Sequence, residues 1–185
     1  MSRQYFMDLL AEPPIADLTA FATVTTDTML WNPAVFTPIP AGDARAGKIY
    51  KVTAGGIITL PASTGSLTIT PRVGATTTVA SSPTLGASGA QFSSGATTNR
   101  PWYIEFNVVV RTIVAAGGAT STMMGWGSFQ TQGVLTTGGA SMNLTMGGTS
   151  AVFDANLAQG IGMSCIWGTT AGSITPQFAC IQSVN

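Results

Sequence analysis

The stretch Trp102-Tyr-Ile-Glu-Phe-Asn-Val-Val-Val-Arg-Thr-Ile113 decides the fold class. Large apolar residues stand at every second position from Trp102 to Val110, while Glu105 and Arg111 occupy positions of the opposite parity. A period of two is that of a β-strand, because successive side chains point to opposite faces of a sheet. We therefore predict a strand over 102–114 with one face toward a core. Glu105 and Arg111 are too far apart to pair along one strand, so each needs a partner on an adjacent strand or subunit.

The chain after Pro14 continues in short β-rich runs separated by Gly, Pro, Ser and Asn. This pattern is typical of an all-β protein, and eight or nine strands suit a jelly-roll-like antiparallel β-sandwich. We expect an N-terminal arm over 1–18 and a single sandwich domain over 19–185, with a loop-rich insertion at 74–101. The predicted strands are 20–26, 47–53, 65–73, 102–114, 121–131, 141–146, 150–155, 160–168 and 174–183.

The arm contains the one segment with a helical pattern, residues 4–12. Its large apolar residues recur at i, i+3 and i+4 and are followed by Pro13-Pro14, which ends a helix. Those residues are Tyr5, Phe6, Leu9 and Leu10. A helix this short is not stable alone in water. It therefore either docks on its own domain or grips a neighbouring subunit.

The last two predicted strands form a hairpin if Gly172-Ser173 is its two-residue turn. The resulting register pairs aromatic with aromatic and cysteine with cysteine: Trp167 with Phe178, and Cys165 with Cys180. A disulfide is geometrically conceivable there, but a chain that is not secreted keeps its thiols reduced. A shift of one residue would remove the pairing.

Charged residues are scarce in this chain of 185 residues: seven Lys and Arg and seven Asp and Glu, giving a net charge of zero. A chain of this length with average usage carries about 46. A surface so neutral tends to self-associate, so we expect partner subunits to cover much of it. Seven scattered cations do not make the basic patch that nucleic acid requires.

Histidine is absent, which removes the commonest general base and the commonest zinc ligand. The carboxylates outside the arm are Asp27, Asp43, Glu105 and Asp154, and no two are close in sequence. No phosphate-cradling GxxxxGK[ST] string occurs. We therefore expect no enzyme activity, no metal and no cofactor. No apolar run is long enough to span a membrane, and Asp8 interrupts any signal peptide, so we expect the chain to stay in the cytosol.

Three further features bear on function, and the first two allow two interpretations each. Asp43 and Arg45 lie in a loop, where they either bond nearby backbone groups or form an intersubunit ion pair. The methionines around Trp126 fill gaps in a core or form an adaptable contact surface. Tyr103 or Trp126, if exposed, is able to stack on sugar rings, as in a lectin-like module.

Several strings of the chain resemble a family of small β-rich virion proteins encoded beside the head and tail genes of tailed bacteriophages. They include Thr37-Pro-Ile-Pro-Ala-Gly-Asp-Ala-Arg-Ala-Gly-Lys-Ile-Tyr50, Ala54-Gly-Gly-Ile57, Leu67-Thr-Ile-Thr-Pro-Arg-Val-Gly74, Pro101-Trp-Tyr-Ile-Glu-Phe106, Arg111-Thr-Ile113, Gly147-Gly-Thr149 and Gln182-Ser-Val-Asn185. The resemblance implies a jelly-roll-type protein that coats or cements a capsid, commonly as a trimer. It carries no active-site residues.

The leading hypothesis is thus a capsid decoration (cement) protein, assembled in the host cytoplasm. It would bind itself as a homotrimer and the major capsid protein on the outer capsid surface, tying capsomers together. A tail or baseplate protein and a carbohydrate-binding host-attachment module are the alternatives. The predicted contact residues are Tyr5, Phe6, Leu9 and Leu10 of the arm, with Arg45, Arg72 and Arg111 as interface hydrogen-bond donors.

Overall fold

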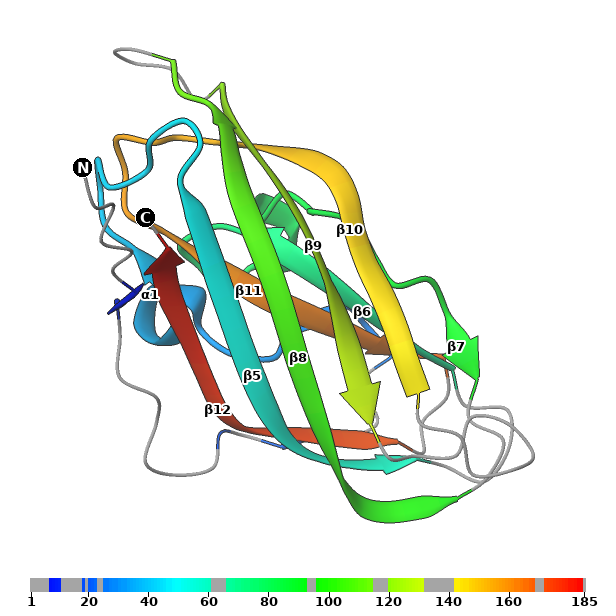
Figure 1. Ribbon diagram of the computed structural model, residues 1–185. Coiled ribbons are helices and arrows are strands. Elements are labelled where there is room, and N and C mark those ends of the chain that lie inside the picture. Colours follow the sequence, from blue (N-terminus) through cyan, green and yellow to red (C-terminus); the bar gives the residue numbers. More distant parts are fainter. Residues whose placement is uncertain are drawn as a thin grey trace.

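A computed structural model describes residues 7–10, 18, 20–22, 25–60, 66–92, 96–114, 120–131, 142–168 and 172–184. Two antiparallel sheets pack face to face in this part of the chain, as Figure 1 shows. The predicted all-β sandwich is therefore confirmed.

The larger sheet has seven strands in the order β1-β12-β5-β8-β9-β10, and β2 also pairs with β12. Their bounds are β1 Met7–Leu9, β2 Phe21–Ala22, β12 Ser173–Val184, β5 Ile49–Leu60, β8 Thr97–Thr112, β9 Ser121–Thr131 and β10 Met142–Phe153. The second sheet has the order β3-β11-β6-β7, with β4 also pairing with β11. Its bounds are β3 Thr28–Met29, β11 Gln159–Trp167, β6 Ser66–Val73, β7 Gln91–Phe92 and β4 Pro38–Ile39.

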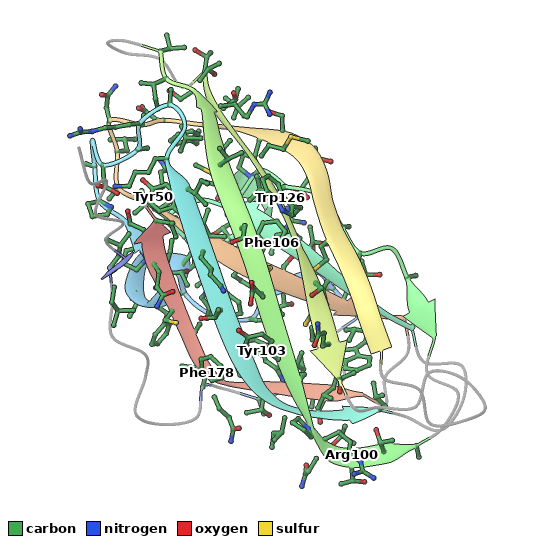
Figure 2. The ribbon with its side chains drawn as sticks, viewed as in Figure 1. Tyr50, Arg100, Tyr103, Phe106, Trp126 and Phe178 are labelled. Atoms are coloured by element: carbon green, nitrogen blue, oxygen red, sulfur yellow. The ribbon has the colours of Figure 1, made fainter. Side chains whose placement is uncertain are left out.

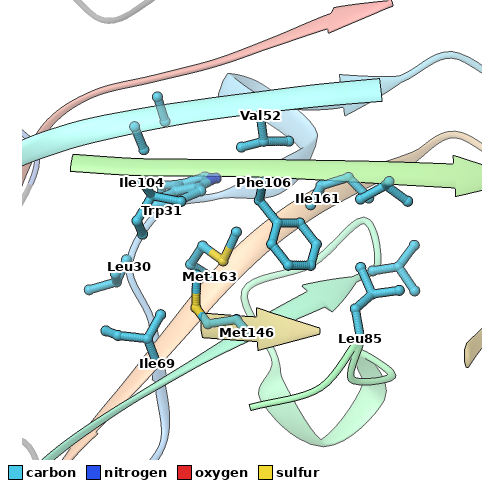
Figure 3. Packing of buried hydrophobic residues seen from close by; sticks show 14 of the residues in the cluster. Leu30, Trp31, Val52, Ile69, Leu85, Ile104, Phe106, Met146, Ile161 and Met163 are labelled. Carbon is cyan, nitrogen blue, oxygen red and sulfur yellow. The ribbon is translucent and has the colours of Figure 1, made fainter. Parts of the chain in front are cut away.

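The core lies between the two sheets and forms one cluster (Figure 3). Every even-numbered residue of β8 from Trp102 to Val110 is buried, as the alternation predicts. Trp102 stacks on Phe129 of β9, with ring centroids 5.7 Å apart. From the second sheet, Met163 of β11 packs into the same cluster near Phe106. Burial of such side chains stabilises the fold by about 2 kcal/mol each.

The second sheet has its outer face covered by other parts of the chain. The segment 28–37, which includes helix α1 (Pro33–Phe36), lies on β11, where a Cβ at Gly160 or Gly162 would collide with it. The 3₁₀ turn Val79–Ser81 lies beside β6. In the described part of the chain no helix or strand lies over the outer face of the seven-stranded sheet (Figure 1).

The predicted helix over 4–12 is wrong at Met7–Leu9, which is strand β1. Met7 lies opposite Val184 and Leu9 opposite Gln182, so β1 runs along the edge of β12. An unpaired strand edge offers free backbone donors and acceptors, whereas a two-turn helix is only marginally stable. This segment therefore pairs as a strand instead of forming a helix. Tyr5 and Phe6 lie outside the described residues.

The predicted hairpin is also wrong, because β11 and β12 belong to different sheets. Cys165 lies opposite Ile69 of β6, Cys180 lies opposite Thr53 of β5, and both thiols are free. The predicted hairpin makes Gly172 a turn residue, but a Cβ there would collide with the ring of Trp167. Glycine fits at this position because the indole leaves no room for a side chain. Trp167 accordingly lies opposite Leu67 and not Phe178.

Other strand boundaries shift where glycines interrupt the pattern. The predicted strands 141–146 and 150–155 are a single strand, β10, whose register shifts between Gly147 and Ser150. Strand β8 begins at Thr97, inside the predicted insertion 74–101. Within the same segment Leu85 is fully buried, and its N–H donates to Pro71, so this side chain anchors the loop in the core.

Candidate functional site

Three segments, 40–48, 110–114 and 154–158, meet at one end of the sandwich, which we call the loop end. The Gly42 N–H donates to the Ala155 carbonyl at 3.0 Å, and the Gly47 N–H donates to the Val110 carbonyl at 2.8 Å. These bonds connect the loop after β4 to the ends of β10 and β8. In Figure 1 the loop end is uppermost, near the C-terminus.

Exposed apolar side chains gather at the loop end. Ile113 is 37% exposed, Val114 41% and Leu157 60%. Leu9 of the adjoining edge strand β1 is 47% exposed, whereas Leu10 packs against the core. Clustered apolar groups next to polar loops are typical of a surface that meets another protein.

A groove of about 600 Å³ opens beside the loop 40–48. Inside it the Asp43 carboxylate accepts from Lys48 Nζ at 2.6 Å and from the Tyr50 hydroxyl at 2.9 Å. Burial raises the pKa of Tyr50 well above its usual range, and the hydrogen bond and charge of Asp43 raise it further. Tyr50 therefore remains a donor that holds Asp43. The sequence predicts that Asp43 either bonds nearby backbone groups or forms an ion pair with another subunit. Neither prediction describes this bonding, because the partners of the carboxylate are side chains of its own chain.

The predicted arginines have different environments. Arg45 lines the groove and is exposed, and Arg111 is exposed on the adjoining end of β8. Neither guanidinium has a hydrogen-bond partner among the residues that the structure describes. The loop end thus brings together two of the three predicted donors.

The structure does not match the prediction that Arg72 donates hydrogen bonds at an interface, because its guanidinium donates to groups of its own chain. Its Nε donates to Ser164 Oγ at 2.8 Å, Nη1 donates to the Ser82 carbonyl at 2.9 Å, and Nη2 forms an ion pair with Asp27. The side chain is only 15% exposed. Arg72 points to the outer face of β6, and the segment 78–82 folds over that face and covers it.

The remaining candidate carboxylates have structural partners. Glu105 accepts from Lys51 Nζ at 3.0 Å on the adjacent strand β5, which confirms the predicted cross-strand partner. Asp154 accepts from the Asn156 N–H at 2.9 Å in a turn. Within the described ranges no three metal-ligating side chains cluster, and no helix is long and apolar enough to cross a membrane.

Two aromatic side chains are exposed on the outer face of the seven-stranded sheet, as Figure 2 shows. Tyr103 of β8 is 39% exposed and Trp126 of β9 is 52% exposed. A second groove, of about 350 Å³, lies over these two strands. Its lining comprises Tyr103, Glu105, Asn107, Gly127, Ser128 and Gln130. Burial and the charge of Glu105 raise the pKa of Tyr103, so its hydroxyl stays protonated.

Comparison with known proteins adds no further constraint. No protein-family model matches the chain, and neither a curated protein nor a solved structure matches it.

Proposed function

We propose that this protein is a capsid decoration (cement) protein that docks on the shell through its loop end. The observation that carries the proposal is the grouping of Ile113, Val114 and Leu157 with Arg45 and Arg111 at one end of a nearly uncharged sandwich. The virion assignment itself comes from the resemblance of the sequence strings to tailed-phage virion proteins. The exposed apolar side chains of the loop end support the proposal, because such side chains suit a contact with another protein.

The composition of the loop end suits a protein partner. Apolar side chains contribute affinity when they are removed from water, at about 25 cal/mol per Å². Arginine is the cation best suited to an interface, because its planar guanidinium donates several hydrogen bonds at a moderate desolvation cost. Lys48 is already neutralised by Asp43, so few unpaired charges would have to be buried.

The same composition supports oligomerisation on the shell. With seven cations and seven anions in the chain, electrostatic repulsion between copies is small. We propose a homotrimer in contact with the major capsid protein, as the family resemblance implies. A tail or baseplate location is the alternative, and imaging of intact particles distinguishes the two by showing where the chain lies.

Apolar residues of the loop end should hold the protein on the capsid. Ile113→Asp and Leu157→Asp should each release it from the capsid, lowering occupancy by about tenfold, because a carboxylate would be buried without a partner. Washing wild-type particles from low to moderate salt should release little, since the contact is mainly apolar. Occupancy is measured by gel densitometry of purified particles.

Val35→Asp is the matched control. Val35 is 56% exposed on α1, on the side of the second sheet, and its replacement should leave occupancy unchanged. Shedding of the wild-type protein at moderate salt would contradict the apolar docking, and equal loss in all three variants would contradict the assignment to the loop end.

A further inference from the structure

The groove on the outer sheet face is built from cross-strand pairs of β8 and β9. Tyr103 lies opposite Gln130, and Glu105 lies opposite Ser128. In the third pair Asn107 lies opposite Trp126, which stands beside the groove and is not one of its lining residues. Ladder hydrogen bonds hold these side chains at fixed spacings, which is the rigidity that a binding site requires.

The two exposed aromatic rings stand at opposite corners of this grid (Figure 2). Tyr103 and Trp126 are separated by four positions along the strands, about 14 Å. On the other side of Trp126 the paired residue of β10 is Gly147, which has no side chain to cover the indole. Each ring therefore presents apolar surface to a ligand that is extended along the strands.

The polar side chains between the rings retain hydrogen-bonding capacity. Glu105 is 42% exposed and still has acceptor positions beyond its bond to Lys51. In the described part of the chain the Asn107 amide has no partner, and Gln130 makes only a 3.4 Å contact to Ser128. An amide both donates and accepts, and a carboxylate accepts. Such a set matches neighbouring hydroxyl groups.

The charge of the groove narrows the ligand class further. Lys51 neutralises Glu105, so neither an anion nor a cation has a net charge to bind. An apolar protein patch would bury Glu105, Asn107 and Gln130 without partners, at a cost of about 1–3 kcal/mol each. A ligand with apolar C–H faces and neutral hydroxyl groups satisfies both the rings and the polar side chains.

We propose that this groove binds a neutral oligosaccharide. Its sugar rings stack on Tyr103 and Trp126, and its hydroxyl groups bond to Glu105, Asn107 and Gln130. The site lies on the sheet face and not at the loop end. A docked chain is therefore able to present it outward, and sugar binding goes beyond the proposed cement function.

The test uses the isolated full-length chain and a set of soluble probes: maltohexaose, cellohexaose, chitohexaose and mannohexaose, together with a broad array of immobilised neutral glycans. Binding is measured by calorimetry and by the fluorescence of the exposed Trp126. We expect saturable binding of at least one probe. Trp126→Ala and Tyr103→Ala should each weaken it by about tenfold, and Trp126→Phe should retain most of it.

Val152→Ala is the matched control, because Val152 is 47% exposed on the same face but outside the groove. It should bind sugar as the wild type does, and circular dichroism verifies that all variants fold. Absence of binding to every glycan overturns the proposal, as does binding that Trp126→Ala leaves unchanged. If no glycan binds and Trp126→Ala instead weakens self-association or capsid occupancy, the face is a protein interface and the proposal is wrong. Sugar binding that survives in Ile113→Asp would separate this site from the docking end.

Discussion

Arg72 joins three separate parts of the chain through one guanidinium group. Its partners lie before β3, in the turn after β6 and on β11: Asp27, Ser82 and Ser164. Because the arginine is largely out of water, its charge depends on Asp27 for compensation, and Asp27 depends on it equally. Its hydrogen bonds therefore hold the segments that cover the second sheet.

Arg72→Ala should lower the free energy of unfolding by about 3–5 kcal/mol, because it leaves the Asp27 carboxylate with an uncompensated charge. Urea denaturation followed by tryptophan fluorescence measures the change. Arg111→Ala is the control, since Arg111 is exposed and its removal should cost less than about 0.5 kcal/mol. Equal losses in the two variants would show that Arg72 is not the internal tie described here.

The two edges of the seven-stranded sheet have different structures. β1 and β2 pair with the outer edge of β12, so this strand has neighbours on both sides. At the opposite edge β10 carries a bulge, with φ of 116° at Gly147 and 88° at Gly148. A bulge increases local twist and makes an edge a poor template for further pairing.

The two glycines of this bulge offer a matched pair of substitutions. A Cβ at Gly147 would collide with the Gly125 carbonyl of β9, whereas a Cβ at Gly148 meets open space. Gly148→Ala should therefore cost about 1 kcal/mol of backbone strain, and Gly147→Ala about 3 kcal/mol or more. Urea denaturation of both variants checks this. A larger loss for Gly148→Ala would refute the assigned contact.

The whole molecule is a sandwich with one covered face, one open face and one apolar loop end. Three ion pairs join six charged side chains of the described residues: Lys48 with Asp43, Lys51 with Glu105 and Arg72 with Asp27. Pairing of this kind leaves little net field to keep copies apart. We therefore expect self-association to depend on the surface of the whole molecule and not on one residue.

We predict that the isolated chain self-associates as a trimer and that its dissociation constant changes less than about threefold between 50 and 300 mM salt. Sedimentation velocity at several concentrations measures this. An increase of tenfold or more in that constant would show that ion pairs hold the subunits together. If the isolated chain stays monomeric at all concentrations, the trimer in the proposed function is wrong.

Local patterns predicted the elements whose side chains face the core. The strand 121–131 has the predicted bounds, and the alternation from Trp102 to Val110 identified the buried face of β8. The same alternation required a neighbour for Glu105, and Lys51 provides it. The candidate site was predicted only in part: Arg45, Arg111 and Leu9 lie at or beside the loop end, but Ile113, Val114 and Leu157 were missed because a short apolar run near a strand end looks like core.

The sequence by itself determined an all-β chain, its buried strand faces and its nearly neutral surface, because alternation and composition are local properties that hold in any arrangement of the strands. Only the tertiary structure decided which strands pair. It placed Cys165 and Cys180 in different sheets, turned Met7–Leu9 into an edge strand and covered Arg72. The physical reason is that backbone hydrogen bonds are the same for every partner, so pairing depends on how all the strands fill one core together.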